Sequence, residues 1–464
     1  MASRRVVQAL RGALATPPLR LSAARSRVCF QCQQRWSSVS QRQGSDRVNF
    51  PGAVNSSFTT DLNFQRATEA DAMPTYRYLD QEGQVIDKAR GEPDVTDDEL
   101  LGYYKTMVTV SILDLIMFDA QRQGKVSFYM VSQGEEGIGV GSSSALRNDD
   151  PLFLQYREHG VFFQRGTTLD DFIAQCFSTK DDTGRGRSMP VHYGSKKHHV
   201  HTISSCLATQ LPQASGAAYA RKIENARNPN KDEHRVVACY FGEGAASEGD
   251  FHAALNIAAT RSCPVVFICR NNGYAISTST LEQYKGDGIA SRGVGYGVDT
   301  IRVDGNDILA VREVTKAARA LALSDGGRPV LIEAMSYRVS HHSTSDDSFA
   351  YRAKVEVEDW KRRDNPITRL RKYMENKGIW DEEKEKQLRS DARKQVLDAY
   401  RKAEKEKWPP LANMLEDVYA EVTEEQKEQL VMVKEMVEKY PEEYDLDIYE
   451  GGLDALKSTV EAQR

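Results

Sequence analysis

Several features that would mark a special class of protein are missing from the 464-residue sequence. No uninterrupted apolar run approaches the roughly 20 residues that a membrane-spanning helix needs, so we do not expect a membrane protein. The net charge of −5 gives no general reason to expect binding to nucleic acid. The seven cysteines are scattered and odd in number, which argues against a disulfide framework and indicates a reducing compartment.

The first 45 residues contain no acidic residue and no lysine, although they contain eight arginines. Serine, alanine and glutamine are frequent there, and the first acid is Asp46. A basic, Ser-rich segment without acids is typical of a mitochondrial transit peptide. We therefore expect residues 1–45 to be a transit peptide and the mature protein to work in the mitochondrial matrix. A basic arm that binds an anionic partner is the alternative.

The remaining sequence divides into three regions. Residues 46–95 are rich in Pro, Gly, Asn and Ser, which indicates an irregular N-terminal arm. Residues 96–355 alternate short apolar strands with helices, and this pattern predicts an α/β domain with a mostly parallel, doubly wound sheet and helices on both faces. In residues 356–464, charged residues dominate and apolar residues recur at helical spacing, so we expect a helical C-terminal extension.

Individual elements can be predicted within these regions. A capping box at Thr96 begins a long helix that runs to about Gln123. The expected strands are 126–131, 235–241, 264–270, 300–303 and 330–335. Further helices are expected in 134–146, 245–260, 307–323, 381–407 and 422–440.

A glycine-rich run, GEEGIGVGSSSAL (134–146), follows the first expected strand. Gly137, Gly139 and Gly141 are spaced GxGxG, and Ser142 stands where the dinucleotide motif GxGxxG needs its last glycine. We therefore do not expect a nicotinamide site here.

The strongest chemical signal is the segment FGEGAASEGD (241–250), which follows one buried strand, together with NNGY (271–274), which follows the next. Glycines allow the backbone to approach an anion, and a helix that begins at Ala245 would offer its N–H groups to phosphate. Glu243 and Asn272 supply a carboxylate and a carboxamide, which are the hard oxygen ligands that magnesium prefers. These two strand ends therefore predict a magnesium and phosphate site.

The paired segments resemble the signature of thiamine-diphosphate enzymes, in which GDG is followed about 26 residues later by NN. Here Glu243 replaces the usual Asp, and its longer carboxylate can also bind magnesium. The resemblance implies the thiamine-diphosphate-binding fold. It also implies that Glu243, Asn272 and the carbonyl of Tyr274 hold Mg²⁺, and that Gly244 and Ala245 hold the diphosphate.

Three segments narrow the resemblance to the alpha subunits of 2-oxo acid dehydrogenase decarboxylase components: QYRE (155–158), MPVHYG (189–194) and TISSCLATQ (202–210). The family commonly has proline where Cys206 stands, and a backbone-carbonyl ligand would survive that change. The diphosphate contacts that the family implies are Tyr156, Arg157, Ser205 and Arg270. The potassium ligands that it implies are Ser204, Cys206, Thr209 and Gln210.

Two further segments, CRNNGYAIST (269–278) and HHSTSDD (341–347), resemble the branched-chain members of the family more than the pyruvate members, which are the alternative. The resemblance implies decarboxylation of a branched-chain 2-oxo acid and transfer of the acyl group to a lipoyl arm. His342 would contact the diphosphate and assist proton transfer. The cluster at His198, His199 and His201 lacks partner carboxylates or cysteines, so we expect no metal there.

The resemblance also implies partners. The carboxylate that activates thiamine is not identifiable here and would come from a beta chain in an α2β2 assembly, with a lipoyl-bearing acyltransferase as the next component. Ser343 matches a kinase target of the family, which implies a regulatory kinase and phosphatase; the family's second phosphoserine falls on Ala353. A one-chain thiamine enzyme and a non-catalytic subunit of the same fold are the rival classes.

Overall fold

The computed structural model describes residues 47–50, 53–57, 59–66 and 71–463. The predicted transit peptide lies outside these described residues. The chain divides into two compact units, residues 1–69 and 70–464. In the first unit, β1 (Arg47–Phe50) and β2 (Ala53–Ser57) form an antiparallel hairpin, so part of the region predicted to be irregular has regular structure.

The second unit is built on a seven-stranded parallel sheet with the strand order β3-β10-β11-β7-β6-β4-β5. The sheet confirms the predicted parallel α/β architecture, and four of the five expected strands lie within two residues of their predicted bounds. The long strands are β6 (Val237–Gly242), β7 (Val265–Asn271), β10 (Asp299–Asp304) and β11 (Val330–Met335), and the short ones are β3 (Thr75–Tyr76), β4 (Leu152–Phe153) and β5 (Val200–His201).

Helices cover both faces of the sheet because the strands are apolar on both sides. In β6, Val237, Cys239 and Phe241 pack into the core beneath α7 and α8, whereas Ala238 and Tyr240 pack into the core beneath α3, α4 and α11. Such double burial is the physical reason for the continuous apolar strands in the sequence. The covering helices are α7 (Gln210–Arg227) and α8 (Gly249–Arg261) on one face, and α3 (Asp97–Arg122), α4 (Glu136–Ser144) and α11 (Ile308–Ala322) on the other.

The glycines of the 134–146 run lie in α4, where they allow close helix packing. A Cβ atom on Gly137 would lie 2.8 Å from the carbonyl oxygen of Gly305, and one on Gly141 would lie 2.8 Å from the carbonyl oxygen of Ile308 at the start of α11. The run therefore brings two backbones together, which explains its composition without any bound nucleotide.

Helix α3 begins at the predicted capping box, in which Thr96 and Glu99 exchange side-chain and backbone hydrogen bonds. By length and composition alone it is the one helix in the described part of the chain that could span a membrane. Twelve of its side chains, from Leu100 to Ala120, are buried within the domain. The central helix of a globular core meets the same criteria.

Two predicted elements are wrong. Residues 126–131 form no strand: Val126, Tyr129 and Val131 are buried, but the segment is bonded to the loop at Thr344, with Thr344 N donating to the carbonyl of Tyr129 over 3.1 Å. The helix expected from Ala245 is interrupted at Glu248, whose ψ of 149° is extended. A 3-10 turn (Ala245–Ser247) precedes α8.

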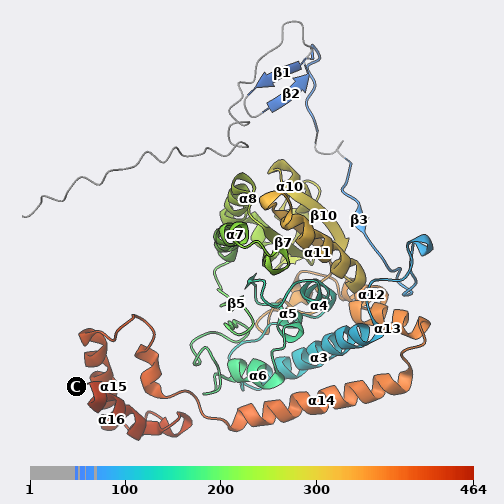
Figure 1. Cartoon of the computed structure of the whole chain (residues 1–464). Helices are drawn as coiled ribbons and strands as arrows, with labels where there is room; N and C mark the ends of the chain where they lie inside the picture. The colour runs from blue at the N-terminus through green and yellow to red at the C-terminus, as the bar shows by residue number, and fades with distance from the viewer. Residues whose placement is uncertain (1–46, 51–52, 58, 67–70, 464) are drawn as a thin grey trace, which may run out of the picture. The chain divides into compact units, whose positions relative to one another are not determined.

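The C-terminal part of the second unit is helical. Helix α14 (Glu382–Lys405) lies along α3 and α6 (Leu169–Phe177), as Figure 1 shows. Helix α15 (Glu424–Lys439) packs with α16 (Gly452–Gln463) around a separate small core. The shorter helices and strands that complete the unit are α5 (His159–Gln164), β8 (Tyr274–Ala275), β9 (Thr278–Ser279), α9 (Thr280–Gln283), α10 (Ala290–Gly295), α12 (Lys354–Arg363) and α13 (Pro366–Asn376).

Candidate active site

The carboxyl ends of the neighbouring parallel strands β6 and β7 bring the predicted metal ligands together. Glu243 directly follows β6 and Asn272 directly follows β7, and the backbone N–H of Asn272 donates to Glu243 Oε2 over 3.4 Å. Gly273 has a φ of +88°, which a glycine adopts without strain, and the turn lets Tyr274 N–H donate to Asn272 Oδ1 over 3.2 Å. Ligands of open parallel sheets bind at such strand ends.

The side chain of Glu243 is suited to a bound cation. It is buried, and its Oε1 has no hydrogen-bond partner among the described residues. Burial, with a contribution from the nearby Glu135, raises the pKa of the Glu243 carboxyl to about 7. A buried carboxylate oxygen without a partner is costly, and a hard divalent cation would satisfy it. The residues present therefore fit the predicted magnesium site.

The predicted phosphate-binding residues lie beside this turn. A Cβ atom on Gly244 would lie 2.8 Å from the Cβ of Ala275, so only glycine allows this close approach. Ala245 begins the 3-10 turn, and its side chain is buried. The N–H groups offered to a phosphate here therefore belong to a tight turn and not to the first turn of a long helix.

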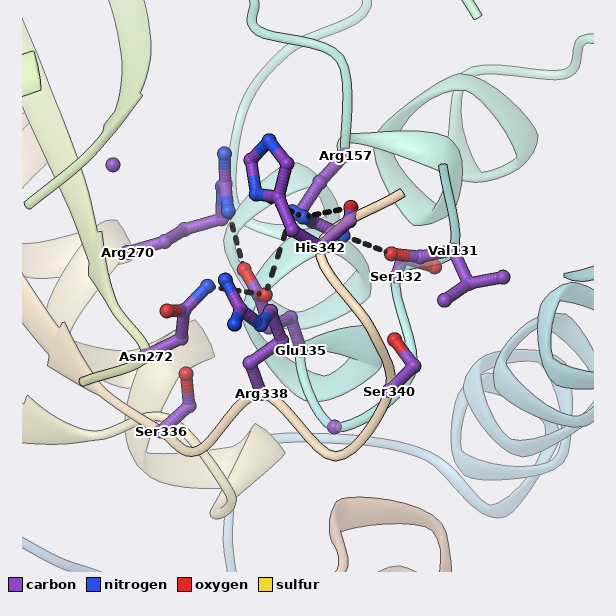
Figure 2. A network of polar contacts seen from close by, with 12 residues as sticks. Val131, Ser132, Glu135, Arg157, Arg270, Asn272, Ser336, Arg338, Ser340 and His342 are labelled. Carbon is purple, nitrogen blue, oxygen red and sulfur yellow. Dashed lines mark hydrogen bonds and ion pairs between the residues drawn. The ribbon is translucent and has the colours of Figure 1, made fainter. Parts of the chain in front are cut away.

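Glu135, next to the start of α4, is at the centre of a buried polar network (Figure 2). Its carboxylate forms an ion pair with Arg270, lies 4.0 Å from Arg157 Nε, and accepts a hydrogen bond of 2.8 Å from Asn272 Nδ2. Burial alone would raise the pKa of Glu135, but Arg270, Arg157 and these hydrogen bonds lower it. Two predicted diphosphate residues and one predicted metal ligand thus contact one carboxylate.

Arg270 has a second buried acidic partner, Glu158, which follows the QYR segment. Burial lowers the pKa of the Arg270 guanidinium, but Glu158 and Glu135 more than offset this and raise it. Gln155 from the same segment accepts a hydrogen bond of 2.7 Å from the backbone N–H of Gly242. The sequence signals did not assign Glu135, Glu158 or Gln155 to the site, although Gln155 and Glu158 lie in the QYRE segment and Glu135 lies in the glycine-rich run 134–146.

His342 lies next to Arg157. Arg157 Nη2 donates to the His342 carbonyl over 2.6 Å and lies 3.2 Å from His342 Nδ1. A guanidinium only donates, so Nδ1 accepts and the neutral ring carries its proton on Nε2. Burial, with the charges of Arg157 and Arg338, lowers the pKa of His342 to about 3. Tyr156 contacts the same ring edge-on, at 6.1 Å between centroids.

The loop that carries His342 is held by a second set of contacts. Asp346 accepts the backbone N–H of His342 over 2.7 Å and the hydroxyl of Tyr351 over 2.6 Å. The buried Arg338 donates to Tyr351 Oη over 2.6 Å and to the carbonyl of Ile276 over 2.7 Å. Ile276 has a φ of +56°, which is rare for a β-branched residue. His341 accepts Ser348 N–H over 2.9 Å outside this set.

Of the four residues predicted to bind potassium, three lie in the loop before α7, and the fourth, Gln210, is the first residue of that helix. Thr209 Oγ1 donates to the Cys206 carbonyl over 3.0 Å, and Cys206 N–H donates to Ser204 Oγ over 3.2 Å. Gln210 Nε2 donates to the Tyr240 carbonyl over 3.0 Å, which ties the loop to β6.

The neighbouring predicted diphosphate residue, Ser205, is less closely connected to the site. It is exposed, and its Oγ lies 2.7 Å from His192 Nε2. No contact described here links Ser205 to Arg157 or Arg270. Within the described ranges, no three His, Cys, Asp or Glu side chains form a metal-binding group. The residues of the predicted metal sites instead offer amide, hydroxyl and backbone carbonyl oxygens and a single carboxylate, that of Glu243.

A comparison with protein families matches residues 104–412 to the dehydrogenase E1 component family. The matched range includes the loops after β6 and β7, which carry Glu243 and Asn272. The chain belongs to the dehydrogenase E1 component family. Members of this family depend on thiamine diphosphate, so the predicted cofactor and fold are confirmed at the level of the family.

Curated relatives are similar over most of their length. The mitochondrial 2-oxoisovalerate dehydrogenase subunit alpha of Mus musculus is 48% identical over 92% of this chain and 93% of the relative. The protein of the same name from Homo sapiens is 49% identical over 90% and 91%, and that from Caenorhabditis elegans is 50% identical over 85% and 90%. These names confirm the predicted branched-chain resemblance over the pyruvate alternative, and they confirm mitochondrial localisation.

Glu136, next to Glu135, has a different environment. It is buried, its Oε2 accepts Gly134 N–H over 2.8 Å, and its Oε1 has no partner among the described residues. Burial, with contributions from Asp114 and Glu135, raises its pKa from 4.5 to about 8. The folded protein therefore favours the protonated form, while the unfolded chain ionises this group near pH 4.5. Because folding retains a proton between these values, this group lowers stability as pH rises from about 4.5 to 8.

We predict that Glu136→Gln removes this pH-dependent cost. The variant should unfold at a higher temperature than the wild type at pH 8, and the two should converge towards pH 5. Thermal unfolding of the cofactor-free assembled protein, measured across this range, checks the sign. A difference between the two proteins that does not change with pH would contradict the assignment.

Proposed function

We propose that this chain is the alpha subunit of a mitochondrial 3-methyl-2-oxobutanoate dehydrogenase (2-methylpropanoyl-transferring). The assembled enzyme oxidatively decarboxylates branched-chain 2-oxo acids and transfers the acyl group to a lipoyl group, in the catabolism of Val, Leu and Ile. The observation that carries the proposal is the meeting of Glu243 and Asn272 at adjacent strand ends, beside Arg157 and His342, in a chain about 48% identical to 2-oxoisovalerate dehydrogenase alpha subunits.

Specific residues would hold the cofactor and its metal. Glu243, Asn272 and the Tyr274 carbonyl would bind Mg²⁺, which in turn would bind the diphosphate. The diphosphate would lie against Gly244 and Ala245. Tyr156, Arg157, Ser205, Arg270 and His342 are the further diphosphate contacts. Ser204, Cys206, Thr209 and Gln210 would bind K⁺ and so fix the Ser205 loop.

Bound thiamine diphosphate supplies the electron sink that makes loss of carbon dioxide possible. The residues of this chain orient and neutralise it. Arg157 and Arg270 place positive charge at the diphosphate, although each already faces a buried carboxylate. His342, held neutral with its proton on Nε2, can donate a hydrogen bond from Nε2 to the diphosphate. The negative charge of the bound diphosphate would raise its pKa, and in that state the ring could exchange a proton with the reacting atoms.

The proposal requires partner chains. The acids that contact the proposed cofactor and metal residues are already engaged: Glu135 and Glu158 contact arginines, and Glu243 faces the proposed metal. The carboxylate that activates thiamine would therefore come from a beta subunit, in an α2β2 assembly with the cofactor at the interface. The acyl group would pass to the lipoyl-bearing acyltransferase component. The mitochondrial matrix is the expected compartment, and residues 1–45 the expected transit peptide.

We predict that the coexpressed alpha and beta chains decarboxylate 2-oxoisovalerate with a kcat/KM at least about tenfold higher than for pyruvate, since even one methylene in an apolar pocket is worth roughly 10–200-fold. The purified alpha chain alone should be inactive. A preference for pyruvate would favour the pyruvate branch. Turnover by the isolated chain, with the beta chain shown absent by mass spectrometry, would contradict the two-subunit assembly.

We predict that Glu243→Ala and Asn272→Ala each weaken Mg²⁺-dependent thiamine diphosphate binding by at least about 100-fold, because removing a direct ligand should exceed the 10–100-fold cost of outer-shell changes. Calorimetry on the reconstituted assembly measures this. Glu248→Ala is the matched control, because Glu248 is exposed and lies in the same loop. Wild-type affinity in both ligand variants would exclude the metal site.

Ser343 is a proposed target of a regulatory kinase and phosphatase. Its side chain is buried, and its Oγ accepts Ser345 N–H over 3.3 Å, so a kinase would need the loop to open. A phosphate adds about −1.5 to −2 charges at pH 7. Placed beside Asp346 and the cofactor's diphosphate, it would repel both, displace His342 and hinder the lipoyl arm.

We predict that Ser343→Glu lowers decarboxylation by roughly 100-fold, the lower end of what a positioned proton-transfer group contributes. Ser345→Glu is the control, because Ser345 lies in the same loop but is exposed. Mapping the site modified by a mitochondrial kinase fraction, with activity measured in parallel, extends the test to phosphate itself. Full activity of stoichiometrically phosphorylated Ser343 would contradict the switch.

A further inference from the structure

The contact between Glu135 and Asn272 involves only the nitrogen end of the Asn272 carboxamide. The Asn272 carboxamide has one oxygen that can ligate a cation and one nitrogen that cannot. Its Nδ2 donates to Glu135 Oε1 over 2.8 Å, and its Oδ1 accepts the backbone N–H of Tyr274 over 3.2 Å. In Figure 2 the nitrogen is directed at Glu135 and the oxygen is directed away from it.

A carboxylate can select this orientation because it only accepts hydrogen bonds. If the Asn272 amide were flipped, Oδ1 would face Glu135 Oε1, and two oxygens without a proton between them would repel in a buried site. Glutamine at position 135 would lack this selectivity, since its own amide can either donate or accept. The ionised form of Glu135 is maintained by Arg270, whose guanidinium pairs with the other carboxylate oxygen.

We propose that Glu135 is a positioning residue of the metal site, which holds the Asn272 carboxamide so that Oδ1 is presented to the divalent cation. The inference rests on the proposed function, because it takes Asn272 as a magnesium ligand. Glu135 contacts Arg157 and Arg270, the proposed diphosphate residues, as well as Asn272. One carboxylate therefore orders both the diphosphate side and the metal side of the site.

The test uses the assembled alpha–beta enzyme and measures the Mg²⁺ concentration that half-saturates thiamine diphosphate binding, by calorimetry. Glu135→Gln should require 10- to 100-fold more Mg²⁺, the range for outer-shell partners of metal ligands. At saturating Mg²⁺ the fraction of sites that bind thiamine diphosphate should reach the wild-type value, because all of the proposed direct metal ligands are still present. Glu136→Gln, an equally buried neighbour that makes no described contact with Asn272, should show the wild-type Mg²⁺ requirement.

Asn272→Asp provides a second, independent variant. Aspartate retains a ligating oxygen and adds charge, so a Glu135 that only filled space would leave Mg²⁺ affinity equal or higher. If Glu135 is a positioning residue, we expect weaker Mg²⁺ affinity, because the Glu135 carboxylate then faces a second carboxylate at position 272. The double variant Glu135→Gln/Asn272→Asp should recover to within about threefold of the wild type, because the amide introduced at position 135 can donate to an aspartate that has no amide to misorient.

The outcomes separate the two proposals. If Asn272→Ala loses Mg²⁺-dependent binding while Glu135→Gln behaves as Glu136→Gln does, the positioning role is wrong and the metal site stands. If Asn272→Ala binds as the wild type does, the metal site itself is wrong. Should Glu135→Gln fail to assemble, Asn272→Asp alone decides: unchanged or tighter Mg²⁺ binding overturns the inference, and weaker binding supports it.

Discussion

One buried ion pair, between Glu135 and Arg270, is the constraint on which the rest of the site depends. Arg270 is the last residue but one of β7, and Glu135 lies just before α4, so the pair joins the sheet to the helical layer above it. Without Arg270, the buried Glu158 would lose its arginine partner and Glu135 would keep only Arg157 at 4.0 Å, and removing one partner of a buried ion pair typically costs several kcal/mol. The metal turn, the QYRE segment and the loop of His342 all contact this pair or its immediate neighbours. The orientation and charge state of the side chains at the site therefore depend on how the sheet and the helical layer pack around them.

The parts of this arrangement that follow from short-range sequence pattern could be predicted. Strands β6, β7 and β11 are apolar on both faces, and a polar residue directly after such a strand falls at the edge where ligands bind. Glu243 and Asn272 were found in this way. Glu135 and Glu158 were not, because their role comes from partners more than 100 positions away along the chain, and no local pattern marks an acid that will be paired with a distant arginine.

The predicted elements that proved wrong have a common physical cause. Residues 126–131 have the composition of a strand, but their backbone is bonded to the loop at Thr344, and the adjoining Ser132 is bonded to the side chain of Asp114, so tertiary partners replaced a sheet neighbour. At Glu248 the chain leaves the helical conformation between Ser247 and Gly249, both weaker helix formers than alanine, after a turn in which Gly244 passes close to Ala275. Propensity describes a segment alone, and both segments are shaped by what lies against them.

The glycines of α4 show that a sequence motif, too, can be explained by its tertiary partners. Gly137 and Gly141 lie where the carbonyls of Gly305 and Ile308 leave no room for a methyl group. A glycine pattern records that something approaches the backbone closely, and it does not distinguish a pyrophosphate from the end of another helix. A larger residue would push α4 away from the turn at Gly305 if placed at position 137, or from α11 if placed at position 141, and Glu135 directly precedes α4. The close packing of α4 thus fixes the position of Glu135, so a substitution in this helix can disturb the cofactor site even when every proposed ligand is unchanged.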